Sequence, residues 1–92
     1  DGMTRCGSTY YAIYNGAAPG FLVSFTRTEK GIEIDRPLGD VTFVDPTQVA
    51  FDGKRLLIVD NSGWATLDKS PSMRAGGAKL LAIPLGSDCK PK

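Results

Sequence analysis

Few residues of this chain could carry acid-base or nucleophilic chemistry. Histidine is absent, which removes Ser-His-Asp and Cys-His catalysis together with the side chain that titrates near neutral pH. Glu33 and Asp35 could form a glycosidase-like carboxylate pair, because residues two apart in a strand point to the same side. Their spacing fits a solvent-facing row opposite Ile32 and Ile34 better. We therefore expect a protein that is not an enzyme and that needs no cofactor.

The two cysteines, Cys6 and Cys89, lie close to opposite ends of the chain. A disulfide between them would stabilise the fold by about 4–5 kcal/mol in the loop-closure model, a large share for a small domain. Two free thiols in a reducing compartment are the alternative. Because the chain has no histidine and no second Cys-x-x-Cys arm, we expect no structural zinc site.

Length and charge restrict the classes of function. A chain of 92 residues with 41% hydrophobic and 23% charged residues is typical of a single folded domain, here a β domain over residues 1–92. The net charge of +1 makes nucleic acid an unlikely partner, since its binding uses many basic contacts. From Lys69 onward the chain has five cations and one acid. This basic end is either a solvated tail or a contact surface for an acidic partner.

Export is expected from the two ends of the chain. It starts at Asp1-Gly2, without an initiator methionine or an apolar leader, as a processed product would. No apolar run approaches the roughly 20 residues that span a bilayer. Together with the cysteine pair, these features predict a periplasmic or secreted protein.

The elements that must position these residues are strands. Apolar residues alternate with polar ones over short segments separated by turn residues, which predicts an all-β fold of seven to eight short antiparallel strands. A small barrel or a sandwich would satisfy this pattern, and one short helical turn at Asp45–Gln48 or Ser70-Pro71 is an alternative local structure. The segments expected to form strands are 8–14, 21–28, 32–38, 41–44, 48–51, 54–60, 64–67 and 78–85.

Side-chain alternation also predicts which side of each strand is buried. In FLVSFTRT, the side with Phe21, Val23 and Phe25 is apolar, so we expect its polar side with Ser24 and Thr26 to face water. Continuous apolar character over Leu56–Val59, in contrast, predicts a central strand covered on both sides.

One family resemblance bears on function. A cysteine near each end, alternating β segments and a Ser-Gly loop after a strand that ends in Asp resemble the periplasmic inhibitors of c-type lysozyme. The resemblance implies a small antiparallel barrel, a disulfide between the terminal cysteines and a loop that enters the lysozyme cleft. In Ser62-Gly63-Trp64-Ala65-Thr66 the family's Ser-Gly is present, and Thr66 stands where the family has tyrosine.

Three hypotheses for function follow. The first is an exported module that binds another protein, such as a muramidase, by loop insertion without catalysis; Trp, Met and Arg are frequent in such interfaces. The second is a structural or accessory domain of an envelope assembly. The third is a carbohydrate or single-strand nucleic-acid binding barrel that uses Tyr10, Tyr11 and Tyr14. For the first hypothesis the expected contact residues are Ser62, Gly63, Trp64, Lys69, Met73 and Arg74.

Overall fold

The computed structural model describes residues 2–15, 20–44, 46–60 and 79–92. The described part is all-β, with seven strands in two antiparallel sheets, which confirms the predicted fold class. The strands are β1 (Met3–Cys6), β2 (Thr9–Tyr14), β3 (Phe21–Thr28), β4 (Gly31–Asp35), β5 (Gln48–Phe51), β6 (Arg55–Asp60) and β7 (Lys79–Pro84).

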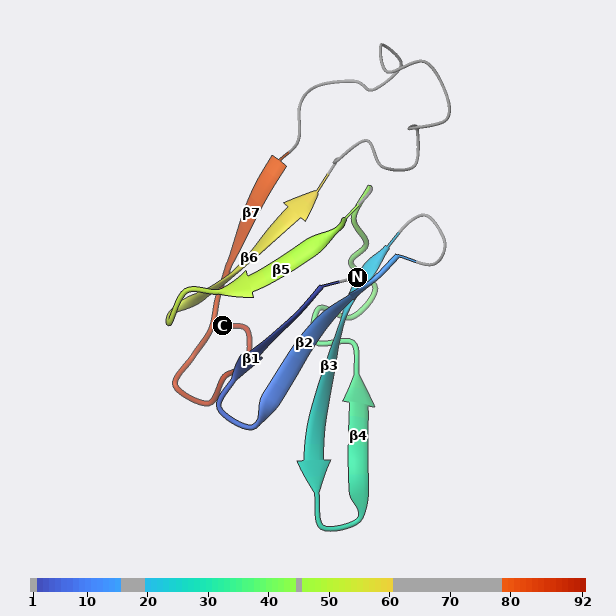
Figure 1. Ribbon diagram of the computed structural model, residues 1–92, viewed down its shortest axis with the longest axis vertical. Helices are drawn as coiled ribbons and strands as arrows, with labels where there is room; N and C mark the ends of the chain where they lie inside the picture. Colours follow the sequence, from blue (N-terminus) through green and yellow to red (C-terminus); the bar gives the residue numbers. More distant parts are fainter. Residues whose placement is uncertain (1, 16–19, 45, 61–78) are drawn as a thin grey trace.

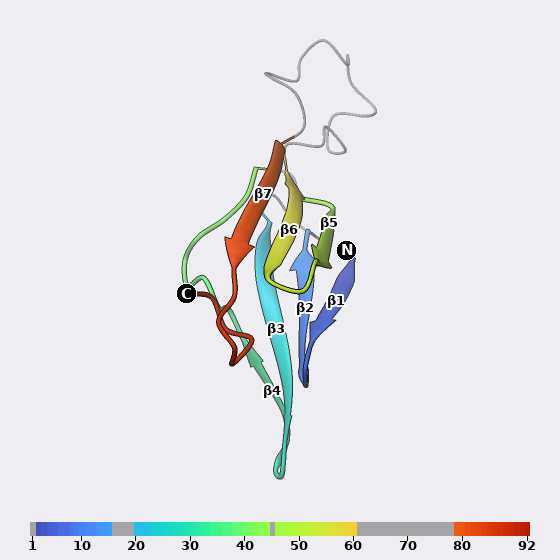
Figure 2. The ribbon, with the colours of Figure 1, turned by 90° about the vertical axis from the view of Figure 1, so that its left-hand side faces the viewer.

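In each sheet, strands that are adjacent in space are also consecutive in the sequence. One has the order β1-β2-β3-β4 and the other the order β5-β6-β7 (Figure 1). The three-stranded sheet lies in front of the four-stranded one in Figure 2, and the two do not close into a barrel. Thr4 joins them, because its Oγ1 accepts a hydrogen bond of 3.2 Å from the amide of Phe51. Of the two predicted architectures, the sandwich is closer to the structure.

Two tight turns follow their sequence signals. Gly31 begins β4 with φ of 129°, and Gly53 lies between β5 and β6 with φ of 100°. Side chains other than glycine rarely adopt such backbone angles. Asp52 supports the second turn, since its carboxylate accepts hydrogen bonds from the amides of Lys54 and Arg55 at 2.9 and 2.7 Å.

Two details of the predicted strand set are wrong within the described residues, and the predicted strand 64–67 lies outside them. Met3–Cys6 forms β1, which was not expected, and residues 41–44 form no strand. In the second segment, Phe43 pairs only with Gly20, through two hydrogen bonds of 2.8 and 3.1 Å. The next amide, of Val44, donates to the Asp60 carboxylate at 3.2 Å. Apolar residues do alternate over residues 41–44, but this segment forms no strand. Its backbone is held instead by the bridge between Phe43 and Gly20 and by the hydrogen bond from Val44 to the Asp60 side chain.

The core lies between the two sheets. The four-stranded sheet contributes Tyr11, Ile13 and Leu22, and the three-stranded sheet contributes residues of its central strand β6 and of β5. Complete burial of such a side chain stabilises the fold by about 1.5–3 kcal/mol. The prediction that Leu56–Val59 is central is confirmed, although only its Leu56 and Ile58 side is fully buried.

The burial predicted for β3 is reversed. Leu22 and Ser24 are buried, whereas Phe21, Val23 and Phe25 are only half-buried. The cause is the cross-strand register, which places Leu22 opposite Ile13 and Ser24 opposite Tyr11. Directly opposite residues share one side of a sheet. The side that faces the core is therefore decided by β2, even though β3 has more apolar residues on its other side.

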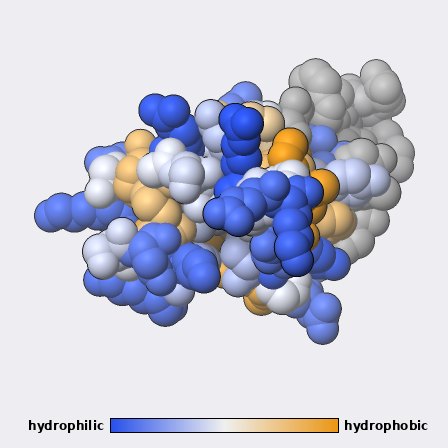
Figure 3. Space-filling view, turned by 90° about the horizontal axis from the view of Figure 1, so that it is seen from below, coloured by the Kyte–Doolittle hydropathy of each residue, from blue (hydrophilic) through white to orange (hydrophobic). Residues whose placement is uncertain are grey.

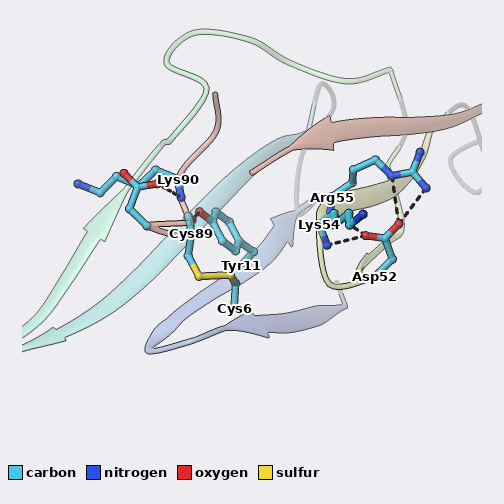
Figure 4. The surroundings of a disulfide bond; sticks show 8 residues. Cys6, Tyr11, Asp52, Lys54, Arg55, Cys89 and Lys90 are labelled. Carbon is cyan, nitrogen blue, oxygen red and sulfur yellow. Dashed lines mark hydrogen bonds and ion pairs between the residues drawn. A yellow bond between two sulfur atoms is a disulfide. The ribbon is translucent and has the colours of Figure 1, made fainter. Parts of the chain in front are cut away.

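A disulfide joins Cys6 at the end of β1 to Cys89 in the C-terminal segment (Figure 4). The two Cα atoms are 5.7 Å apart, within the usual range for a bridge. Beside it, the Tyr11 hydroxyl donates a hydrogen bond to the backbone carbonyl of Cys89. Burial, reinforced by the Asp88 carboxylate, raises the pKa of Tyr11 above its ordinary value of 10.0. The C-terminal segment is thus held on the inner side of the four-stranded sheet.

Candidate functional site

The residues predicted to contact a partner lie outside the described part of the chain. All of them belong to the range 61–78, so their role stays a prediction. They are Ser62, Gly63, Trp64, Lys69, Met73 and Arg74.

The described residues offer a different surface, the side of the four-stranded sheet that is turned away from the core. We call it the outer face. Its position follows from the register, because Arg5, Tyr10, Phe25 and Ile34 are opposite one another across all four strands, and strand residues alternate between the two sides. The apolar residues of the outer face are Met3, Tyr10, Ala12, Tyr14, Phe21, Val23, Phe25, Ile32 and Ile34.

Several of these apolar side chains are open to solvent. The exposed fractions are 62% for Met3, 71% for Ile32 and 63% for Ile34, and Tyr10 and Tyr14 are also exposed. Figure 3 shows apolar residues at the molecular surface between hydrophilic ones. Single exposed apolar residues are common, but a contiguous set is typical of interaction sites.

An aromatic cluster fixes one end of the outer face. The rings of Tyr14 and Phe21 are opposite each other in β2 and β3 and are stacked, with centroids 4.8 Å apart and planes inclined by 21°. The guanidinium carbon of Arg36 lies 4.0 Å from the centre of the Phe21 ring. Aromatic stacking and cation–π contacts of this kind are favourable, so the three side chains form one cluster on the outer face.

The charge of the outer face has one sign. Arg5 and Arg27 belong to its register, and Arg36 lies over Phe21. Within the four described strands, the acids Glu33 and Asp35 occupy the opposite side, paired with Thr26 and Ser24. The prediction that these two carboxylates share one side of the strand is confirmed. The expectation that Ile32 and Ile34 are the covered side is wrong, because every residue of β4 is exposed.

The second sheet also has an apolar outer side. Leu57 and Val59 of β6 are half-buried, and their neighbours Ala82 and Leu80 in β7 are exposed. These side chains are all aliphatic, whereas the outer face also carries aromatic rings. The two sheets therefore present apolar residues in opposite directions from one core.

The three tyrosines do not form one surface. Tyr10 and Tyr14 lie on the outer face, but Tyr11 is buried in the core. The third hypothesis used all three tyrosines together, and sequence reasoning missed the outer face as a site. The missing information was the register, which combines alternate residues of four separate segments.

Comparison with models of protein families, with curated proteins and with solved structures finds no match for this chain. Within the described ranges, no cluster of three or more Cys, Asp or Glu residues could hold a metal ion. The same ranges contain no helix that is long and apolar enough to cross a membrane.

Proposed function

We propose that this chain is a protein-binding module and that the outer face is its contact surface. The observation that carries the proposal is the set of apolar side chains, including Ile32 and Ile34, that share one side of four strands and remain exposed. Their transfer from water to a partner would release about 25 cal/mol per Å² of apolar area. Arginines without neighbouring acids on this face favour a partner whose apolar surface carries carboxylates.

The aliphatic part of the outer face supports a protein partner over a nucleic acid. Single-stranded bases stack on open aromatic rings, whereas the most exposed residues here are Met3, Ile32 and Ile34. The Phe21 ring is covered on its faces by Tyr14 and Arg36. A chain with a net charge of +1 also has little electrostatic attraction for nucleic acid.

The disulfide supports a location in an oxidising compartment, and we propose the periplasm or the exterior of the cell. Inhibition of a muramidase through Ser62 and Gly63 is a separate part of the proposal that rests on the resemblance. Its test is the rate of cell-wall hydrolysis by c-type lysozyme with increasing amounts of this protein. No inhibition at a large molar excess would reject that part and leave the outer face in place.

A second candidate function is an accessory domain within a larger envelope assembly. The apolar outer side of β6 and β7, with Leu80 as its most exposed large residue, favours it. A domain covered on two opposite sides would bind neighbours through both sheets, whereas a simple binding module needs only the outer face.

Selection from a random peptide library on the immobilised protein tests the leading proposal. Enriched peptides should combine apolar residues with Asp or Glu, and Arg27→Glu or Ile34→Thr should weaken their binding about tenfold, which corresponds to about 1.4 kcal/mol. Leu80→Thr is the matched control, because it removes an equally exposed aliphatic side chain from the other sheet. Peptides without acids, or binding that Leu80→Thr alone weakens, would contradict the proposal.

A further inference from the structure

The inner side of the four-stranded sheet contains a hollow at the end where the C-terminal segment crosses it. Its volume is about 370 Å³. Thr9, Ser24 and Thr26 line it from β2 and β3, Asp35 from the end of β4, and Lys90 from the C-terminal segment. The register places Thr9 opposite Thr26 and Ser24 opposite Asp35, so the strand side chains form one continuous polar surface.

The hydroxyl groups of this hollow, from Thr9, Ser24 and Thr26, have no side-chain hydrogen bond to another described residue. Ser24 has only 7% of its surface exposed. None of the described residues has a buried side-chain nitrogen or oxygen without a partner, so these hydroxyl groups are open to solvent and can be reached by a ligand. Each hydroxyl can donate one hydrogen bond and accept others. The surface therefore suits a ligand whose own groups both donate and accept hydrogen bonds.

The charges at the hollow are balanced. Asp35 supplies a carboxylate and Lys90 an ammonium group. Arg36 also lines the hollow, but its guanidinium is held over Phe21 on the outer face. The hollow therefore has no excess positive charge that would select a phosphate or sulfate.

The remaining walls are apolar and fixed. Tyr11, Pro37 and Pro91 complete the lining, and the Tyr11 hydroxyl is occupied by the Cys89 carbonyl. The disulfide ties the segment with Lys90 and Pro91 to the end of β1. Tyr11 is buried, so the half-buried rings of Pro37 and Pro91 are the accessible apolar surface. Apolar rings next to a row of hydroxyls suit a ligand with both C–H faces and hydroxyl groups.

We propose that this hollow binds a small neutral polyhydroxylated ligand, such as one sugar unit of a glycan. Ser24, Thr9 and Thr26 exchange hydrogen bonds with its hydroxyls, and Asp35 accepts from two neighbouring ones. The volume lies at the lower end of the range of about 300–1,000 Å³ that is typical of ligand pockets. This binding is independent of the outer face, because the two sites lie on opposite sides of one sheet.

Titration followed by two-dimensional amide NMR tests the proposal, with glucose, N-acetylglucosamine and inorganic phosphate as separate probes. At least one sugar should shift the amide signals of Thr9, Ser24, Thr26 and Asp35 with a dissociation constant in the millimolar range or below. Phosphate should not shift them. Shifts with phosphate alone, or no shift with either sugar, would overturn the proposal.

Two variants locate the binding. Ser24→Ala and Asp35→Asn should each weaken sugar binding at least fivefold, and Asp35 is exposed, so its variant keeps the fold. Ser87→Ala, an exposed hydroxyl outside the hollow, is the control and should leave the affinity unchanged. Equal affinity of wild type and Asp35→Asn for the sugar would reject the assignment. Ile34→Thr should leave sugar binding intact, which separates this result from the test of the outer face.

Discussion

The two faces of the four-stranded sheet have different roles: the inner face, which is turned towards the core, stabilises the fold, and the outer face is available for contact. The inner face carries Tyr11, Ile13 and Leu22 into the core and is tied to the C-terminal segment by the disulfide. The outer face carries more apolar side chains, and Ile32 and Ile34 among them stay exposed. A contiguous set of exposed apolar residues promotes association with other molecules. The position of these residues on one face therefore indicates a binding surface.

Removal of the disulfide should have the largest effect on the inner face. Cys6→Ser with Cys89→Ser opens a link between residues that are 83 positions apart, and we expect a loss of about 4 kcal/mol in the free energy of unfolding. Urea unfolding followed by circular dichroism measures it. A loss below about 1 kcal/mol would show that the core alone holds the C-terminal segment.

Truncation of one apolar residue on each face compares them directly. Leu22→Ala removes a side chain with 1% exposure and should lower the free energy of unfolding by about 2–5 kcal/mol, because it leaves a cavity. Ile34→Ala is the matched variant on the outer face and should cost about 1 kcal/mol or less. Equal losses in urea unfolding would mean that the outer face is part of the core.

Tyr11→Phe should have a smaller, pH-dependent effect. Loss of the hydrogen bond to the Cys89 carbonyl should cost about 1 kcal/mol at neutral pH. Because the folded-state pKa is raised above 10.0, the neutral tyrosine stabilises the fold below pH 10, and this contribution is lost as the pH rises through the raised pKa. Tyr11→Phe should therefore flatten the alkaline fall in the melting temperature, and an unchanged alkaline fall would contradict this role of Tyr11.

The smallest effect is expected at the turn between β5 and β6, away from both faces. Hydrogen bonds from the amides of Lys54 and Arg55, and then from the Arg55 side chain, lower the pKa of Asp52 to about 2. Its ionised form thus contributes stability above pH 3.8 that is lost as the pH falls towards 2. Asp52→Asn should lower the melting temperature slightly at pH 7, and this difference should shrink as the pH falls to about 2. A constant difference at both pH values would contradict this role.

Local sequence patterns predicted most strands of the described part but not the roles of their faces. The turn residues between the predicted strands include Gly31 and Gly53, which take positive φ at two hairpins, and Pro37 follows the edge strand β4. In β3, counting apolar residues selected the wrong side, because Leu22 and Ser24 are buried by their partners in β2. Which side of a strand is covered depends on how the two sheets pack together. The residues of one segment alone do not determine this packing.

The candidate site was beyond sequence reasoning for the same physical reason. The outer face joins residues from four strands, such as Arg5, Tyr10, Phe25 and Ile34, that become neighbours only through the register. The hollow likewise depends on the C-terminal segment, which the disulfide places over β2 and β3. The cysteine pair was the one signal of that placement, and its predicted bridge is present in the structure.

The double variant Ile32→Thr with Ile34→Thr tests most directly whether the outer face serves binding and not folding. Threonine keeps the β-branched shape that strands favour and removes apolar surface from two exposed positions. We expect the free energy of unfolding to stay within about 1 kcal/mol of wild type, with at least a tenfold loss of affinity for a selected acidic, apolar peptide. Unchanged affinity, or a loss of several kcal/mol in stability, would contradict the division between the two faces.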